Sequence, residues 1–274
     1  MKKLKALFSA FILALSVIGM AYGDNIDMSV TVVGQNPVVD SVVVNDASPT
    51  SGTTTQITVT TQVTDTNGVD DIDVVNASFT VGNPANGKTI TVNMRSGCSN
   101  VDTDTIECSA TYNMQFYDDA MTYTVQVYAE DANGGSDTGT DTFAYSELVS
   151  LDIDVSAIAF GSMDVGETKE VLGDDTWSSG TATIKNQGNV LLDAKVNASD
   201  FDGSTDSFGA DQAQIKFDAL SYFALSNAEQ TEASLDLAKG VSSVENVDLK
   251  LTIPTGALPE SYTSTMALVG VKSS

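Results

Sequence analysis

The sequence predicts an all-β protein with two tandem β-sandwich (immunoglobulin-like) domains after a signal peptide. Many short segments alternate apolar and polar residues, which is the pattern of half-buried strands. Clusters of Gly, Asn and Asp separate these segments at near-regular spacing, which favours a sandwich over an α/β fold. Only residues 228–239 fit a helical pattern, and they do so weakly.

The clearest strand lies in residues 121–135. One face of its alternation carries Met121, Tyr123, Val125, Val127 and Ala129. The run stops in an Asp-Ala-Asn-Gly-Gly turn, whose residues tolerate a positive φ. We expect this segment to be the penultimate strand of an immunoglobulin-like sandwich.

Residues 1–23 are predicted to be a secretory signal peptide. A basic start, Met-Lys-Lys-Leu-Lys, precedes a short apolar run and the small residues before Asp24. The alternative is an uncleaved anchor, but the run is shorter than the roughly 20 apolar residues that span a bilayer. We therefore expect an extracellular protein at the cell surface, with no transmembrane segment in the mature chain.

The mature chain divides into three predicted parts. Residues 24–35 form an N-terminal strand or arm, 36–147 the first sandwich and 148–274 the second. Ile26, Met28, Val30 and Val32 alternate with polar residues in the arm. This arm is either the first strand of its own domain or a strand for self-association with another copy.

The first sandwich is expected to hold seven strands. They are predicted at residues 38–44, 54–64, 73–81, 89–94, 105–114, 121–130 and 138–145, with a hairpin turn at 83–87. The second unit opens with residues 148–155 and 158–166. Its further strands are expected near 181–189, 191–196, 247–253 and 262–271.

Cys98 and Cys108 are the two cysteines of the chain. In an oxidising compartment such a pair is expected to form a disulfide, clamping a hairpin between the strands at 89–94 and 105–114. Two free thiols are the alternative.

Composition excludes several functions. The chain has no His, which removes Ser-His-Asp catalysis and His-ligated zinc. Its formal charge is −25, and loss of Lys2, Lys3 and Lys5 with the leader makes it −28. Nucleic acid is a poor partner for such a surface, whereas cations are good ones. Paired carboxylates are compatible with a glycosidase, but nothing marks a cleft, so we expect no enzymatic activity.

Two acidic loops form the sharpest candidate site. In an immunoglobulin-like sandwich the second-to-third strand loop and the loop before the last strand emerge at the same end. Such a gathering of carboxylate and amide oxygens suits Ca²⁺ as a cofactor. The predicted metal ligands are Asp65, Asn67, Asp70, Asp71, Glu130, Asp131, Asn133 and Asp137. The alternative is two ordinary turns with solvated acids, since the full EF-hand spacing is absent.

Three further residues are singled out. Asn76 and Asn197 stand in Asn-Ala-Ser triplets that match the N-glycosylation sequon. Trp177 lies in a loop-like setting, where it either stacks on a sugar or fills a gap at the domain edge.

Two sets of motifs resemble known families. Residues 65–72, 109–112 and 123–134 resemble an immunoglobulin-like repeat common in archaeal and bacterial secreted surface proteins. Residues 160–166, 183–189 and 253–263 resemble a second β-sandwich domain of envelope proteins and the subunits of extracellular filaments. Glu260 stands where that domain often has Gly. The resemblance implies fold and location, and it carries no catalytic assignment.

These observations predict a secreted, non-catalytic surface protein with a structural or adhesive role. Its expected partners are cell-envelope or surface proteins or glycans. The alternatives are a carbohydrate- or ligand-binding module and a filament subunit joined by strand exchange through residues 24–34.

Overall fold

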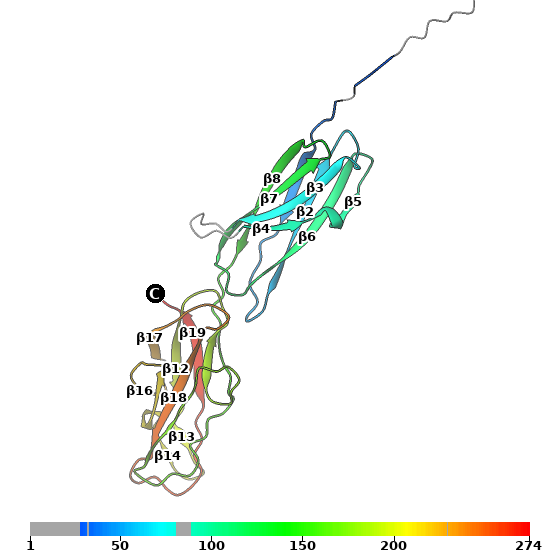
Figure 1. Ribbon diagram of the computed structural model, residues 1–274. Helices are drawn as coiled ribbons and strands as arrows, with labels where there is room; N and C mark the ends of the chain where they lie inside the picture. Colours follow the sequence, from blue (N-terminus) through cyan, green and yellow to red (C-terminus); the bar gives the residue numbers. More distant parts are fainter. Residues whose placement is uncertain (1–27, 32, 81–88, 229) are drawn as a thin grey trace, which may run out of the picture. The chain divides into compact units, whose positions relative to one another are not determined.

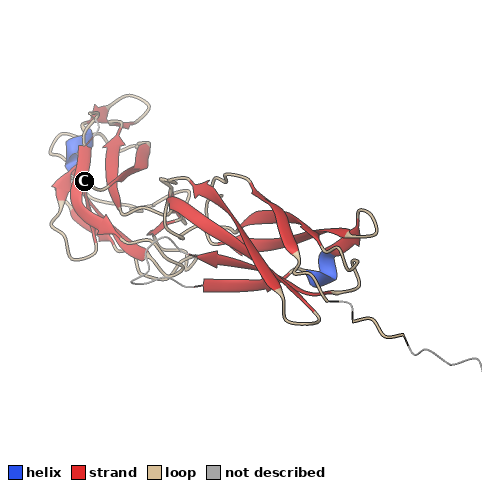
Figure 2. Ribbon diagram, turned by 90° about the horizontal axis from the view of Figure 1, so that it is seen from above, coloured by secondary structure: helices blue, strands red, loops and turns tan. Residues whose placement is uncertain are grey.

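The computed structural model describes residues 28–31, 33–80, 89–228 and 230–274. Within these residues the protein is built from strands and loops, with two short 3-10 turns at Arg95–Gly97 and Ala210–Gln212 (Figures 1 and 2). The predicted all-β class is confirmed. Residues 35–274 contain two separate hydrophobic cores, each shared by antiparallel sheets.

The first sandwich consists of two four-stranded sheets. One sheet has the order β1-β2-β6-β5 and the other β4-β3-β7-β8 (Figure 1). Their bounds are β1 Val38–Val44, β2 Thr55–Thr64, β5 Cys98–Asn100, β6 Thr105–Met114, β3 Ile72–Thr80, β4 Thr89–Asn93, β7 Met121–Asp131 and β8 Ser136–Tyr145. The seven predicted strands are all present, with ends that differ by at most two residues. The described residues of this unit hold eight strands, however, because the short strand β5 was not predicted.

The core of this sandwich follows from the period-two alternation. Tyr123, Val125, Val127 and Ala129 of β7 are buried, and β2 buries Ile57, Val59 and Val63 on the facing sheet. Tyr123 also donates its hydroxyl to the carbonyl of Asp119 at 2.8 Å. A tyrosine near the start of this strand that bonds to the chain a few residues upstream is a known device of immunoglobulin-like sandwiches.

Carboxylates, in place of ladder hydrogen bonds, join β1 to β8. Asp137 accepts a hydrogen bond from the N–H of Val39, and Asp141 accepts one from the N–H of Val44. The two strands also approach closely, because a Cβ on Gly139 would lie 2.7 Å from a methyl group of Val39. The free edge of β1 is thereby covered, which protects it from pairing with another chain.

The disulfide between Cys98 and Cys108 is confirmed, but the hairpin it closes differs from the prediction. The two cysteines are direct partners in the β5–β6 pairing. The strand at 89–93 instead pairs with β3 in the other sheet. The chain therefore changes sheets between β4 and β5, and the disulfide stabilises only the short β5–β6 hairpin.

The second sandwich also packs two main sheets around one core. The larger sheet has the order β16-β15-β18-β11-β9, with β10 also paired to β18, and the smaller has the order β17-β12-β19. The larger sheet contains β9 Leu151–Ile153, β10 Thr168–Val171, β11 Thr183–Asn186, β15 Ala213–Phe217, β16 Phe223–Ala224 and β18 Val244–Thr252. The smaller contains β12 Leu192–Ala198, β17 Gln230–Leu237 and β19 Met266–Lys272, and a separate hairpin pairs β13 Phe201–Asp202 with β14 Ser207–Phe208.

Two expectations for this unit need correction. Gln230–Leu237 is a strand paired with β12, so the helical pattern at 228–239 was wrong. Pairing within a sheet overrides a weak local preference. Residues 158–166 form a loop and not a strand. Ile158, Phe160 and Met163 in this loop pack against the core.

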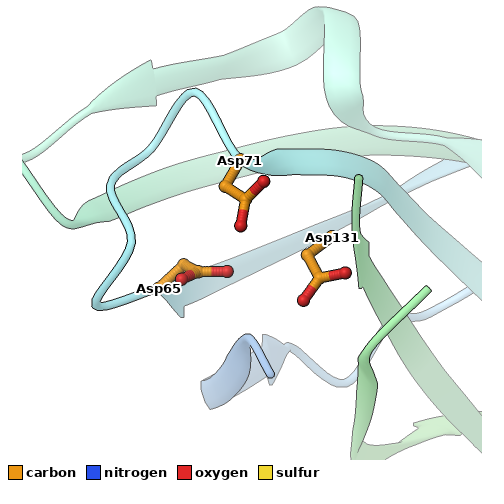
Figure 3. Close-up of side chains that lie close together, drawn as sticks. All are labelled: Asp65, Asp71 and Asp131. Atoms are coloured by element: carbon orange, nitrogen blue, oxygen red, sulfur yellow. The ribbon is translucent and has the colours of Figure 1, made fainter. Parts of the chain in front are cut away.

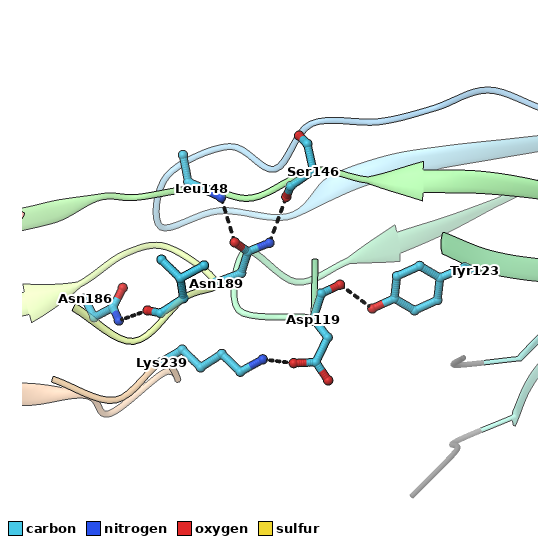
Figure 4. A network of polar contacts seen from close by, with 8 residues as sticks. Asp119, Tyr123, Ser146, Leu148, Asn186, Asn189 and Lys239 are labelled. Atoms are coloured by element: carbon cyan, nitrogen blue, oxygen red, sulfur yellow. Dashed lines mark hydrogen bonds and ion pairs between the residues drawn. The ribbon is translucent and has the colours of Figure 1, made fainter. Parts of the chain in front are cut away.

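The Asn-Gln-Gly-Asn motif at 186–189 is explained by its side-chain hydrogen bonds (Figure 4). Asn186 is fully buried and donates to the carbonyls of Val190 and Leu237. Asn189 accepts from the N–H of Leu148 and donates to the carbonyl of Ser146. The motif thus fixes the chain that enters the second sandwich, which is a structural role.

The N-terminal predictions fall largely outside the described residues. The signal peptide 1–23 and the start of the arm belong to that part, as does the turn at 83–87. Residues 28–31 and 33–34 carry no strand pairing, and Met28, Val30 and Val33 are exposed. Among the described residues, no helix has the length and apolar character needed to cross a membrane.

Candidate metal centre

The β2–β3 loop places two of the candidate carboxylates. Asp65 follows the last residue of β2, and its Oδ1 accepts the N–H of Asn67 at 2.8 Å. The Gly68 N–H bonds to the Asp65 carbonyl at 2.9 Å, so the loop turns sharply. It returns through Asp71, the residue before β3, whose N–H bonds to the Gly68 carbonyl at 3.0 Å.

The β7–β8 turn supplies the third carboxylate. Oδ1 of Asp131 accepts hydrogen bonds from the N–H groups of Asn133 and Gly135, both at 2.8 Å. Gly134 has a φ of +86°, as the turn residues predict. The Ala132 N–H then bonds to the Asp71 carbonyl at 2.9 Å, which holds the two loops together.

Asp65, Asp71 and Asp131 meet at this end of the sandwich. One carboxylate oxygen from each lies within 4.8 Å of the others, and the three side chains point toward a common centre (Figure 3). Asp65 and Asp131 are only 1% and 3% exposed. Oδ2 of Asp65 is buried and has no hydrogen-bond partner in the part of the chain that the structure describes. Buried polar atoms are normally satisfied, so this oxygen needs an explanation.

The electrostatics of the cluster are unfavourable without a cation. Loss of water around Asp71 raises the pKa of its carboxyl above the usual range, and the nearby charges of Asp65 and Asp131 raise it further. Carboxylates this close repel one another unless something neutralises them. The site can therefore bind a hard cation through oxygen, or hold a proton in place of one.

The carboxylates of Asp70, Glu130 and Asp137 do not belong to this cluster. Asn67 accepts the N–H of Gln35 at 2.6 Å through its side chain. Glu130 accepts the hydroxyl of Tyr128, and Asp137 accepts the N–H of Val39 on β1. Asp70 and Asn133 are exposed loop residues. The structure therefore brings together three of the six predicted carboxylate ligands.

Sequence reasoning missed Asn36. Its Oδ1 lies 2.5 Å from the position that a Cβ on Gly135 would occupy, and Oδ2 of Asp131 lies 2.6 Å from the same position. The Asn-Pro pair before the first strand was its only signal. Such a pair indicates a turn and says nothing about which loop the amide will face.

The sequence analysis also named Asn76, Asn197 and Trp177, and each of these lies in an ordered part of the fold. Asn76 and Asn197 are half-buried in the inner strands β3 and β12. Glycosylated Asn residues usually lie in exposed surface loops instead. The ammonium of Lys185 lies 5.6 Å from the ring centre of Trp177, a cation–π distance.

An open cavity of about 400 Å³ lies on the first sandwich, away from the acidic cluster. Its lining is aromatic and polar and includes Phe79, Tyr112, Gln115, Tyr117 and Asp118. Lys239 also reaches it and pairs with Asp119, as Figure 4 shows.

No family model and no curated protein matches the sequence. Among solved structures, dimeric latent PorU from Porphyromonas gingivalis aligns over 88% of this chain and 20% of its own, with 12% identity and a TM-score of 0.30. The chaperone–tip adhesion subunit complex CsuC–CsuE of Acinetobacter baumannii pili aligns over 84% and 100%, with 10% identity and a TM-score of 0.37. Carbohydrate-binding modules of the β-sandwich superfamily align over 86% and 96%, with 10% identity and a TM-score of 0.27. The chain spans a fifth of the first of these structures, and at such scores no function is drawn from the similarity.

Proposed function

We propose that this protein is an extracellular, non-catalytic β-sandwich protein with a structural or adhesive role at the cell surface, and that its first sandwich binds Ca²⁺. The observation that carries the calcium site is Oδ2 of Asp65, which is buried without a hydrogen-bond partner among the described residues and belongs to a carboxylate that lies beside two others. A buried charge is stable only when it is paired or coordinates a metal.

The donor set selects the cation. All three side chains offer carboxylate oxygen, and the chain contains no His. Ca²⁺ takes 6–8 oxygen ligands in flexible geometry, whereas zinc prefers nitrogen and sulfur and Mg²⁺ demands a near-ideal octahedron. Three carboxylates would also leave coordination positions for water or an amide oxygen.

Features of the sequence and the structure support the proposed extracellular location. A leader-like start and a disulfide suit an oxidising compartment. Calcium sites of extracellular modules typically bind with dissociation constants of about 10⁻⁴ to 10⁻³ M. A site with this few carboxylates fits that range, so calcium would act as a constant stabiliser and not as a transient signal.

Asp65→Asn tests the calcium site most sharply. When a chelator removes Ca²⁺, Asp65→Asn should have a higher melting temperature than the wild type, because the substitution removes an unpaired buried charge. With Ca²⁺ at a hundredfold excess over its dissociation constant the order should reverse, since only the wild type gains the binding energy of about 2.7 kcal/mol. Asp70→Asn is the matched control from the same loop and should change neither result. If Ca²⁺ leaves the wild-type melting temperature unchanged, the calcium proposal is wrong.

A ligand-binding module is the second candidate function. The aromatic and polar lining of the cavity beside Tyr112 and Tyr117 supports it, because sugars stack on exposed aromatic rings. Glycan-array binding that is lost in Tyr117→Ala, with unchanged thermal stability, would favour this function. Absence of binding to any glycan would leave the structural role.

A filament subunit joined by strand exchange is the third candidate. The exposed alternating residues Met28 and Val30 support it, since an extended segment can add to a sheet edge of another copy. Sedimentation of the mature protein should then show concentration-dependent polymers that disappear on deletion of residues 24–34. A protein that stays monomeric at high concentration with Ca²⁺ present excludes this assembly.

A further inference from the structure

The side chain of Asn36 lies close to Asp131, although Asn36 is outside the two loops that build the acidic cluster. A Cβ on Gly135 would lie 2.5 Å from Oδ1 of Asn36 and 2.6 Å from Oδ2 of Asp131. The other oxygen of Asp131 is committed to the N–H groups of its own turn. An amide oxygen and a carboxylate oxygen are therefore close enough to bind one cation, since Ca²⁺–oxygen distances are about 2.3–2.6 Å.

The chain around Asn36 is attached to the same loop as Asp65. The N–H of Gln35 donates to the side-chain oxygen of Asn67 at 2.6 Å, and the N–H of Asn67 donates to Asp65. Pro37 is buried, and β1 begins at the next residue. Residues 35–37 therefore enter the sandwich beside the acidic cluster.

Among the described residues, the Gln35–Asn67 hydrogen bond and the burial of Pro37 hold this entry segment beside the β2–β3 loop. Gln35 and Asn36 are both exposed, and the residues described before them, 33 and 34, are exposed as well. Oδ1 of Asn36 cannot form a hydrogen bond with a carboxylate oxygen, since both atoms offer only lone pairs. A cation reverses this, because amide oxygen is one of the ligands that Ca²⁺ prefers.

We propose that Asn36 is the fourth protein ligand of the Ca²⁺ site, and that ion binding fixes the entry segment 35–37 and with it the origin of the N-terminal arm. This inference rests on the proposed calcium site and adds a conformational consequence to it. Calcium then decides whether the arm leaves the sandwich from an ordered or a mobile base.

The test measures Ca²⁺ affinity and local order separately in the purified full chain. Calorimetric titration should give a dissociation constant about tenfold higher for Asn36→Ala than for the wild type. Asn36→Asp should restore binding, because it returns an oxygen ligand at the same place. Gln35→Ala is the matched control, since Gln35 contributes only its main-chain N–H, and it should bind like the wild type.

Amide hydrogen exchange gives the second readout. Calcium should slow exchange at residues 35, 36 and 38–39 of the wild type, and should fail to do so in Asn36→Ala even at saturating Ca²⁺. If the wild type binds no Ca²⁺, the proposed function itself fails. If Asn36→Ala binds as tightly as the wild type and its entry segment gains the same protection, the calcium site stands and this inference is overturned.

Discussion

Oδ2 of Asp137 accepts a hydrogen bond from the main-chain N–H of Val39 at 2.9 Å, across 98 residues of sequence. The carboxylate thus gives the edge of β1 a hydrogen-bond acceptor, which in a continuous sheet would be a carbonyl group of the neighbouring strand. Its counterpart at the other end of the strand is Asp141, which accepts the N–H of Val44 at 3.0 Å. Asp137 therefore belongs to the joint between the two sheets and not to the acidic cluster, although it lies six residues after Asp131.

Asp137→Ala should destabilise the first sandwich by roughly 1–2 kcal/mol, because it leaves the Val39 N–H without its acceptor. Asp137→Asn removes the charge but keeps a carbonyl oxygen, so it should cost clearly less. Urea unfolding measures both changes. Calcium affinity should be unaltered in each variant, and a weakened affinity in Asp137→Asn would assign Asp137 to the metal centre after all.

Tyr123→Phe should cost about 1–2 kcal/mol, because the carbonyl of Asp119 loses a buried hydroxyl donor. Tyr262 repeats this arrangement in the second sandwich, where it donates to the Leu258 carbonyl four residues upstream. Tyr262→Phe should therefore also lower stability, in the second unit. Thermal unfolding followed by calorimetry can separate the two effects, and equal stability of Tyr123→Phe and the wild type would contradict the assignment.

The hydrogen bonds to the carboxylate of Glu260 predict that the folded protein loses stability in acid. Its carboxylate accepts the Ser204 hydroxyl and the N–H groups of Thr205 and Asp206, and these bonds hold the pKa of Glu260 below its usual value. Because the folded pKa is the lower one, the stabilisation is present above the unfolded pKa of about 4.3 and disappears as the pH falls through the folded pKa.

The measurement compares the stability of the wild type with that of Glu260→Gln between about pH 6 and about pH 3, a range that includes the unfolded pKa. The wild type should be the more stable protein at the upper limit, and the difference should shrink toward the lower one. Other carboxylates with lowered pKa values, such as Asp206 and Asp174, will destabilise both proteins in acid. Only the pH dependence of the difference therefore reports on Glu260, and a difference that does not change with pH would refute its role.

Replacing both cysteines by Ser should destabilise the first sandwich by roughly 2.5–3 kcal/mol, since Cys98 and Cys108 close a loop with a sequence separation of 10. The second sandwich should keep its own transition. Non-reducing peptide mapping of secreted protein should recover the two cysteine peptides linked. Recovery of two alkylatable thiols would disagree with the disulfide.

Gly188→Ala should be among the most damaging small substitutions in the second unit. A Cβ on Gly188 would lie 2.2 Å from the carbonyl oxygen of Leu148, and main-chain atoms cannot move aside as a side chain can. We expect a cost of about 3 kcal/mol. Gly166→Ala is the contrast, because its Cβ would meet no atom within 4 Å and only its φ of +81° opposes the change. That cost is roughly 1–2 kcal/mol, and the reverse order would show that the close approach to Leu148 is not rigid.

The sequence by itself determined the all-β class and the strands of the first sandwich. Residues such as Val125 and Val127 follow a period of two that only a strand can bury on one side, so local pattern and tertiary structure agree. It also indicated which two loops share an end of the sandwich. The weaker predictions fell where local pattern is ambiguous, as at Gln230–Leu237, whose pairing with β12 is a long-range contact.

Tertiary structure alone decided which acidic residues meet. Asp65, Asp70 and Asp71 are alike in sequence, yet only Asp65 and Asp71 turn toward Asp131, because the hydrogen bonds of Asn67 and Gly68 set the direction of each side chain. Asn36 comes close to Asp131 from 29 residues before Asp65, through the path of the chain into β1. Side-chain direction in a loop and proximity between distant segments arise from packing and hydrogen bonding of the whole fold, so no local pattern encodes them.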